Sequence, residues 1–245
     1  IGRVRSQHSS YALTTNQEKQ KQKMTKIRIQ DKNPYDFSIK ETLHPDLWED
    51  DALKQEVIEM LLKIADDFIE GLDIDGIEVE DIQFTGSLAN FNWSSYSDID
   101  LHLLIDFSKI DENEDLVRQY LNTKKNLWNN RHRILIKGFE VEIYPQDVAE
   151  EHHSTGVYSI MNEEWVVKPV RKEFSPSIDD IKKKVKDFIN KSDVLNSVDK
   201  IKALRKRIRK MRKCGLEDKG EYSIENLAFK VLRRINFMKK LRDLE

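Results

Sequence analysis

The stretch that decides the fold is residues 84–105, which read Phe84-Thr85-Gly86-Ser87-Leu88-Ala89-Asn90-Phe91-Asn92-Trp93-Ser94-Ser95-Tyr96-Ser97-Asp98-Ile99-Asp100-Leu101-His102-Leu103-Leu104-Ile105. Residues 81–85 alternate apolar and polar side chains, which predicts the end of a β-strand. Gly86 and Ser87 form a turn that a short helix can follow, and residues 98–105 alternate again. The pattern therefore predicts two strands joined by a polar loop.

The second of these strands presents two acids on one face. Side chains on a strand alternate between faces, so Asp98 and Asp100 point one way while Ile99, Leu101 and Leu103 point into a core. Two neighbouring carboxylates repel each other unless a cation lies between them. Oxygen ligands on a rigid strand suit Mg²⁺, with Mn²⁺ as an alternative.

The turn before the acids has the properties of a phosphate site. Backbone N–H groups at a helix start have no partner within the helix and attract anions. Gly86 permits close approach of a ligand, and Ser87 adds a hydroxyl group. A phosphate site and a metal site separated by one loop indicate a nucleoside triphosphate, such as ATP, as ligand.

These motifs resemble the signature of the DNA polymerase beta-like nucleotidyltransferase superfamily. The signature is a glycine-serine turn, here Gly86-Ser87, then ten residues, then an acid-apolar-acid strand, here Asp98-Ile99-Asp100. The resemblance extends over about residues 46–145. It implies an α+β fold with a small mixed or antiparallel sheet and flanking helices.

The same resemblance implies a third carboxylate on a later strand. Glu142 in Val141-Glu142-Ile143-Tyr144-Pro145 fits best and is similar to the acid-bearing strand of the cyclic-oligonucleotide-synthase-like branch; Glu140, on the same face, is the alternative. The family arrangement implies that Asp98, Asp100 and Glu142 hold two Mg²⁺ ions, while Gly86 and Ser87 hold phosphates. A cation for the triphosphate is expected among Lys124, Lys125, Arg131 and Arg133.

Charge divides the chain into two parts although the net charge is only −2. Residues 176–245 hold 21 Lys and Arg against 11 Asp and Glu, about +10, and the first 175 residues hold 21 against 33, about −12. We expect a nucleotidyltransferase domain over residues 24–175 and a basic helical domain over residues 176–245. Residues 1–23 read as a disordered leader or an artefact, with Met24 a possible start.

Cysteine content and hydropathy indicate the compartment. A single cysteine, Cys214, excludes an internal disulfide and is typical of the reducing cytoplasm. No apolar run approaches the ~20 residues of a membrane span. The sequence thus predicts a cytoplasmic protein.

Apolar periodicity predicts the remaining elements. A strand is expected over residues 25–30, and helices from Pro45 to Gly71 and from Asp111 to Trp128, the latter with Leu116, Val117, Tyr120, Leu121 and Leu127 inward. A hairpin around Gly138 would bring Glu142 beside the aspartate strand by antiparallel pairing. Residues 150–169 predict a turn and a strand; metal binding by His152 or His153, and base stacking by Tyr158 or Trp165, are the less favoured alternatives there.

The C-terminal part predicts three helices. They run from Ser177 to Asn190, from Val194 to a stop at Gly215, and from Ile224 to Leu244. The second carries a basic run that could bind a polyanion such as RNA, or form a solvated face: Arg205, Lys206, Arg207, Arg209, Lys210, Arg212 and Lys213.

Three functions fit the sequence. The first is metal-dependent transfer of a nucleoside monophosphate from a triphosphate to a hydroxyl on RNA, protein or a small molecule, with release of pyrophosphate. The second is a non-catalytic module that binds nucleotide or RNA. The third is a toxin–antitoxin or other interaction protein of the same fold. The sequence does not identify the acceptor, the base or the oligomeric state.

Overall fold

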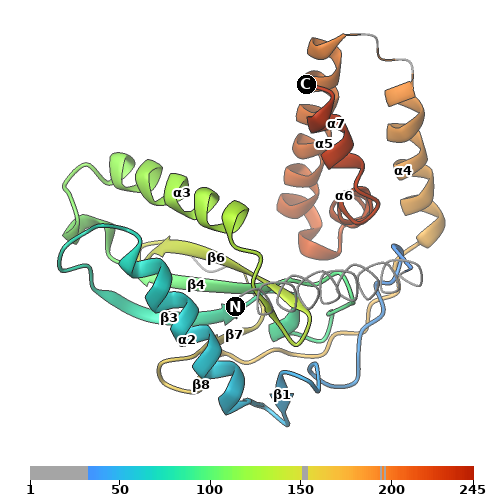
Figure 1. Ribbon diagram of the computed structural model, residues 1–245. Coiled ribbons are helices and arrows are strands. Elements are labelled where there is room, and N and C mark those ends of the chain that lie inside the picture. The colour runs from blue at the N-terminus through green and yellow to red at the C-terminus, as the bar shows by residue number, and fades with distance from the viewer. Residues whose placement is uncertain (1–32, 151–153, 194, 196) are drawn as a thin grey trace, which may run out of the picture.

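A computed structural model describes residues 33–150, 154–193, 195 and 197–245 of the chain. The structure confirms the predicted α+β fold, with a mixed six-stranded sheet followed by a helical region (Figure 1). The strands are β1 (Trp48–Glu49), β2 (Ala52–Leu53), β3 (Val79–Thr85), β4 (Ile99–Ile105), β5 (Leu135–Ile136), β6 (Phe139–Asp147), β7 (Val157–Ser159) and β8 (Glu164–Val167). The α-helices are α2 (Gln55–Glu70), α3 (Glu114–Arg131), α4 (Ile178–Asp193), α5 (Val198–Lys219), α6 (Ile224–Arg234) and α7 (Phe237–Asp243).

The main sheet has six strands in the order β5-β6-β4-β3-β7-β8. Strands β4 and β6 pair in parallel, and the other neighbours pair antiparallel. The parallel pair is possible because α3 carries the chain back between the two strands. The predicted hairpin forms between β5 and β6, but β6 meets the aspartate strand in parallel rather than antiparallel register.

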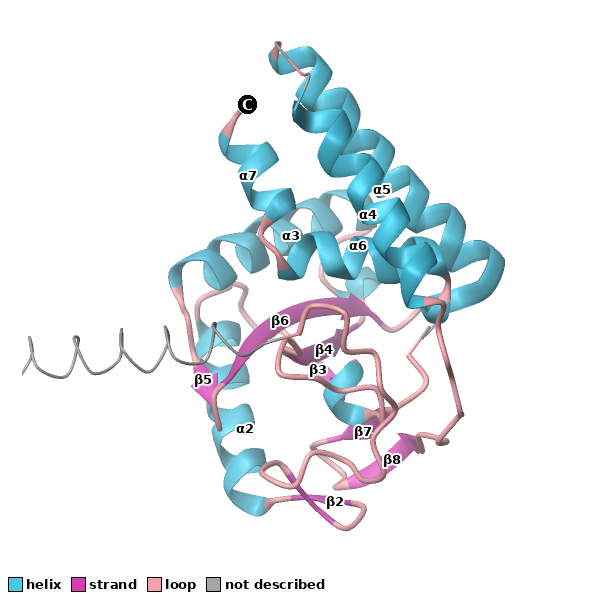
Figure 2. Ribbon diagram, turned by 90° about the vertical axis from the view of Figure 1, so that its right-hand side faces the viewer, coloured by secondary structure: helices cyan, strands magenta, loops and turns pink. Residues whose placement is uncertain are grey.

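One face of the sheet is covered by helices and the other carries the polar side chains. On β4, Ile99, Leu101, Leu103 and Ile105 are buried, while the residues between them are partly exposed. Helices α2 and α3 lie on the same side of the sheet (Figure 1, Figure 2). Their buried side chains form one core with those of β4. The opposite face is therefore free to present Asp100 and its neighbours to a ligand.

The first helix begins later than the apolar spacing predicts. Residues Trp48 to Leu53 form the hairpin of β1 and β2, and α2 starts at Gln55. The turn of this hairpin contains Asp50 in the left-handed region, φ 52°. The Trp48 indole donates a hydrogen bond to the carbonyl of Leu88 at 2.8 Å, which anchors the hairpin to the loop after β3.

Two inward positions predicted on α3 are correct and three are wrong. Val117 and Leu121 are buried, but Leu116, Tyr120 and Leu127 are exposed. Helix α3 packs against β6 along a narrow stripe, so only the side chains on that stripe, such as Val117 and Leu121, are buried. The strand expected at residues 25–30, the leader at 1–23, Met24, His152 and His153 lie outside the described residues.

The helical region has a hydrophobic core of its own. Side chains from α4, α5, α6 and α7 form it, and Tyr35 and Phe37 from the start of the described chain pack against it. Figure 1 shows these helices, orange to red, as a stack beside the sheet. Ser177 accepts a hydrogen bond from the Asp180 amide, as expected of a helix cap. The domain boundaries themselves stay a prediction.

Two predicted helix ends in this region are wrong. Gly215 lies inside α5, which continues to Lys219. A Cβ atom at Gly215 would lie 2.4 Å from the Glu225 Cβ atom. This glycine therefore serves close packing of α5 on α6 rather than termination. The last predicted helix breaks at Asn236, φ 59°, so α6 and α7 are separate, and Ile235 is exposed.

No helix in the described part of the chain is long and apolar enough to cross a membrane.

Candidate active site

The parallel pairing of β4 and β6 brings the predicted acids together. Asp100 is the direct partner of Glu142 in the register, and Asp98 lies immediately before β4. Asp100 and Glu142 share the face of the sheet that α2 and α3 leave open, since Val141 and Ile143 point to the buried side. We call Asp98, Asp100 and Glu142 the carboxylate trio.

The trio carries an electrostatic cost that centres on Asp100. Burial, the Glu142 charge and the Asp98 charge together raise the pKa of Asp100 from its ordinary 3.8 to about 7. Arg233 and Lys230 oppose this rise. A carboxyl held so far from its usual pKa beside two others is typical of a functional site, because a bound cation would relieve the repulsion.

The glycine-serine turn lies directly against this carboxylate. Gly86 has φ 79°, and a Cβ atom there would lie 1.9 Å from Asp100 Oδ2. Ser87 begins a short 3₁₀ helix, Ser87–Ala89, and its hydroxyl bonds that of Ser97 at 2.7 Å. Glycine is thus required at position 86 both by the backbone conformation and by the space that Asp100 occupies.

The turn and the trio line one wall of a cleft of about 1190 Å³. The opposite wall comes from the helical region and contains Arg212 of α5 and Lys230 and Arg233 of α6, which we call the basic wall. Arg233 Nη2 lies 3.8 Å from Asp98 Oδ2. Burial lowers the pKa of Lys230, although Glu221, 4.0 Å away, and Asp100 favour its charged form. An acidic wall therefore faces a basic wall across a space that is open to a ligand.

The register favours Glu142 over Glu140 as the third acid. Glu140 also lines the cleft, but its strand partner is Leu135 on β5, and it pairs with Arg133 at 3.2 Å. Glu142 lies directly beside Asp100 and contributes to the raised pKa of that group. The role of Glu142 remains a prediction, now with a geometric basis.

The four cations expected for a triphosphate have different positions. Lys124 binds the carbonyl of Gly71 and the carboxylate of Asp73, and Lys125 lies 4.1 Å from the centre of the Tyr144 ring. Arg131 is exposed at the end of α3, and only Arg133 of the four lines the cleft. Burial lowers the pKa of Lys125 and the Glu142 charge opposes this, so Lys125 lies close enough to interact with the trio. Arg233 and Lys230 of the basic wall act on Asp100, whose pKa they lower.

Sequence reasoning missed Lys230 and Arg233. The signal available was their spacing, because residues three apart on a helix share a face. That spacing shows which side of α6 is basic, but not which part of the molecule that side meets. The packing of the helical region decides this.

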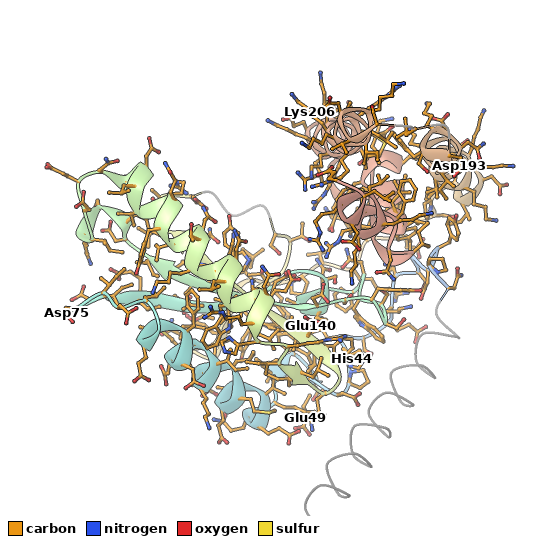
Figure 3. The ribbon with its side chains drawn as sticks, turned by 45° about the horizontal axis from the view of Figure 1, so that its top comes forward. His44, Glu49, Asp75, Glu140, Asp193 and Lys206 are labelled. Atoms are coloured by element: carbon orange, nitrogen blue, oxygen red, sulfur yellow. The ribbon has the colours of Figure 1, made fainter. Side chains whose placement is uncertain are left out.

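The basic run on α5 does not act as one surface. Arg212 and Lys213 line the cleft, whereas Lys206, Arg207, Arg209 and Lys210 are exposed elsewhere and Arg205 pairs with Glu245. Figure 3 shows Lys206 at the outer side of the helical region, away from the strands. Over the residues that the structure describes, there is no support for the predicted RNA contact.

The aromatic candidates Tyr158 and Trp165, and His102 beside the aspartates on β4, make structural contacts. Tyr158 is buried, and Trp165 stacks on Trp48 with ring centres 4.9 Å apart. His102 Nδ1 lies 2.6 Å from Gln146 Oε1, and its ring stacks on Tyr144. The favoured structural interpretation of residues 150–169 is consistent with strands β7 and β8.

The donor set of the trio fits a hard divalent cation, since all its ligand atoms are carboxylate oxygens. Within residues 33–150, 154–193, 195 and 197–245, no group of three or more His, Cys, Asp or Glu side chains is already arranged as a metal site. The raised pKa of Asp100 nevertheless shows that a negative charge there is unfavourable and that a nearby cation would stabilise it. The trio therefore fits Mg²⁺ by chemistry, and its side chains would adjust on binding.

Comparison with known proteins gives one remote likeness. No model of a known protein family and no curated protein matches the chain. Among solved structures, the chain is similar to a STING-associated CdnE c-di-GMP synthase from Capnocytophaga granulosa, with 14% identity and a TM-score of 0.22 over 79% of this chain and 84% of the other. At that TM-score the likeness is remote, and the function below is inferred from the residues and their geometry.

Proposed function

We propose that the protein is a metal-dependent nucleotidyltransferase that moves a nucleoside monophosphate from a nucleoside triphosphate to a hydroxyl group. The observation that carries the proposal is the register pair of Asp100 and Glu142, with Asp98 beside it, against the Gly86 turn. This constellation matches the signature that residues 86–100 resemble in sequence. Its position in a cleft with a basic opposite wall supports a polyanionic substrate.

Each part of the cleft has a role in this proposal. Asp98, Asp100 and Glu142 would hold Mg²⁺, which when bound neutralises developing charge on the phosphates and lowers the pKa of the acceptor hydroxyl. Ser87 and the backbone at Gly86 would contact the phosphates. Lys230 and Arg233, opposite them, would bind the β- and γ-phosphates through charge-assisted hydrogen bonds.

The proposed reaction is an in-line displacement at the α-phosphorus. A bond forms from the acceptor oxygen to the α-phosphorus, and the bond from that phosphorus to the bridging oxygen breaks, with the electron pair leaving on pyrophosphate. The hydroxyl proton passes to a carboxylate of the trio, of which Glu142 is the most exposed, and then to water. The chain itself mainly positions the substrates and balances their charge.

A transfer assay tests the proposal. Each of four α-labelled nucleoside triphosphates would be incubated with protein, Mg²⁺ and cell extract, with and without RNase. We expect label transfer with wild type that disappears in the Asp98→Ala, Asp100→Ala double variant. RNase sensitivity of the labelled product then separates RNA acceptors from protein or small-molecule acceptors.

The matched control is Asp66→Ala with Asp67→Ala. These acids are also neighbours, but they lie exposed on α2, on the far side of the sheet from the trio. The control should transfer label at the wild-type rate. Absence of transfer by folded wild-type protein under every condition would contradict the proposal and favour a non-catalytic nucleotide-binding module.

A further inference from the structure

A single arginine, Arg234 at the end of α6, ties the helical region to the loop that leads into the candidate site. Its Nη1 donates hydrogen bonds to the carbonyls of Pro34 and Asp36, both at 2.9 Å, and its Nη2 donates to Ser94 Oγ at 3.2 Å. Its guanidinium also lies over the rings of Phe37 and Tyr96, 4.6 and 5.0 Å from their centres. One side chain thus joins three segments that are distant in sequence.

The contact with Ser94 reaches the site through a turn. Ser97 donates its amide to the Ser94 carbonyl at 3.0 Å, and the Ser94 amide donates to Ser97 Oγ, also at 3.0 Å. Ser97 Oγ in turn bonds Ser87 Oγ at 2.7 Å, and Asp98 is the next residue. The position of the turn at residues 94–97 therefore sets where Ser87 and Asp98 lie.

Arg234 also shares a helix turn with cations of the basic wall. Lys230 and Arg233 precede it by four residues and one residue, and all three line the cleft. Fixing Arg234 on the 94–97 turn consequently fixes the distance from Lys230 and Arg233 to the trio. The hydrogen bond from Asn92 Nδ2 to Glu221 Oε2, at 3.0 Å, also joins the two walls, but it makes no contact with the 94–97 turn.

We infer that Arg234 is a positioning residue for the nucleotide site: it holds the 94–97 turn on α6, so that Ser87 and Asp98 face Lys230 and Arg233 across the cleft. Arginine is needed because its planar group donates in several directions at once while it lies over the rings of Phe37 and Tyr96. Lysine keeps the charge but offers neither the fork nor the stacking surface. The inference takes its substrate, a nucleoside triphosphate, from the proposed function. The positioning role itself is argued from the Arg234 contacts alone.

Arg234→Lys tests the inference by amide hydrogen exchange on the full chain. Loss of one hydrogen bond to a charged donor should speed exchange in residues 94–98 about tenfold or more. Exchange in β4, β6 and α5 should stay at the wild-type rate. Binding of an α,β-methylene triphosphate analogue with Mg²⁺, measured by calorimetry, should weaken by a similar factor because the site is no longer held ready.

Two further variants make the result specific. Ser94→Ala removes the acceptor of both Arg234 Nη2 and the Tyr96 amide while the Pro34 and Asp36 contacts remain, so it should speed exchange over the same residues, most of all at Tyr96. Arg242→Lys, exposed on α7, should change neither exchange nor binding. Unchanged exchange at residues 94–98 in Arg234→Lys would overturn the inference. Faster exchange spread equally over every helix would also overturn it, because it would show general destabilisation.

The experiment separates this inference from the proposed function. If wild type transfers no nucleotide but Arg234→Lys loosens residues 94–98 and weakens binding of the analogue, the positioning role stands and the transferase proposal fails. If wild type transfers nucleotide and Arg234→Lys has wild-type KM, kcat and analogue affinity, the positioning role fails and the transferase proposal stands.

Discussion

The two walls of the cleft differ in how the chain builds them. The acidic wall comes from neighbouring strands and a turn, with Gly86, Asp98 and Asp100 within 15 residues of sequence and Glu142 placed by strand register. The basic wall comes from helices whose residues follow some 130 positions later and reach the site only through packing of the helical region. A local motif can therefore supply the acidic groups of a site, while the basic groups that offset their charge are placed by tertiary structure.

The largest expected effect comes from breaking the acidic wall at its tightest contact. Gly86→Ala would place a methyl group where Asp100 Oδ2 lies, at a backbone conformation that alanine adopts only with strain. Displacing Asp100 by even about 1 Å should lower kcat/KM for transfer by about 100-fold or more. Steady-state kinetics with the labelled triphosphate measures this.

Gly76→Ala is the matched control for that variant. Gly76 has φ +70°, close to that of Gly86, but nothing lies within 4 Å of a Cβ atom there. Gly76→Ala should lose stability from backbone strain alone, whereas Gly86→Ala also displaces Asp100, and only Gly86→Ala should lose transfer. Equal activity in the two variants would show that the close approach of Gly86 to Asp100 has no functional consequence.

The basic wall should be the next most sensitive. Lys230→Met keeps much of the side-chain volume and removes the charge, so KM for the triphosphate should rise about 10- to 100-fold, as expected for lost charge-assisted hydrogen bonds. The exposed Lys239 on α7 provides the control, since Lys239→Met should leave KM unchanged. A Lys230→Met enzyme with wild-type KM would remove the basic wall from triphosphate binding.

Features set by local sequence, as in the acidic wall, could be predicted, whereas features set by tertiary packing, as in the basic wall, could not. The alternation of residues 98–105 could be read locally, because a strand has a fixed period of two and a buried face. The preference for Glu142 over Glu140 rests instead on the family resemblance, since the two acids share one face of β6 and periodicity cannot separate them. The α5 stop at Gly215 and the single final helix were predicted wrongly, because glycine can serve packing as well as termination and because Asn236 can adopt a left-handed conformation. Arg233 and Arg234 are adjacent in sequence, yet one faces Asp98 and the other faces Ser94, a distinction that only the packed structure contains.

The pH dependence of stability should reveal the cost of holding an ionised Asp100 buried beside Glu142 and Asp98. The folded pKa of Asp100, about 7, is above its unfolded value, so the folded metal-free protein retains a proton that the unfolded chain releases. Stability should therefore fall as pH rises from about 4 to about 7, by about 4 kcal/mol at most, and change little above that range. Burial raises this pKa most, the Glu142 and Asp98 charges raise it further, and Arg233 and Lys230 lower it.

Urea unfolding in EDTA at pH 5, 6, 7 and 8 measures this effect, with Asp100→Asn as the reference that cannot ionise. The difference in unfolding free energy between the two proteins isolates Asp100 from other carboxyl groups. Adding Mg²⁺ at pH 8 should stabilise wild type and not Asp100→Asn. A difference that stays constant with pH would mean that the folded pKa of Asp100 is ordinary.

The smallest effect is expected on the outer side of α5, where the comparison between walls predicts no role in transfer. Lys206 and Lys210 are exposed and one helix turn apart, whereas Lys213 on the same helix lines the cleft. Lys206→Gln with Lys210→Gln should change kcat/KM by less than about twofold, because both side chains lie outside the cleft, and Lys213→Gln should raise KM several-fold because Lys213 lines it. If the outer pair instead lowered transfer as much as Lys213→Gln, and did so more strongly at low salt, the acceptor would be a polyanion that extends beyond the cleft, since contacts with such an acceptor weaken steeply with salt.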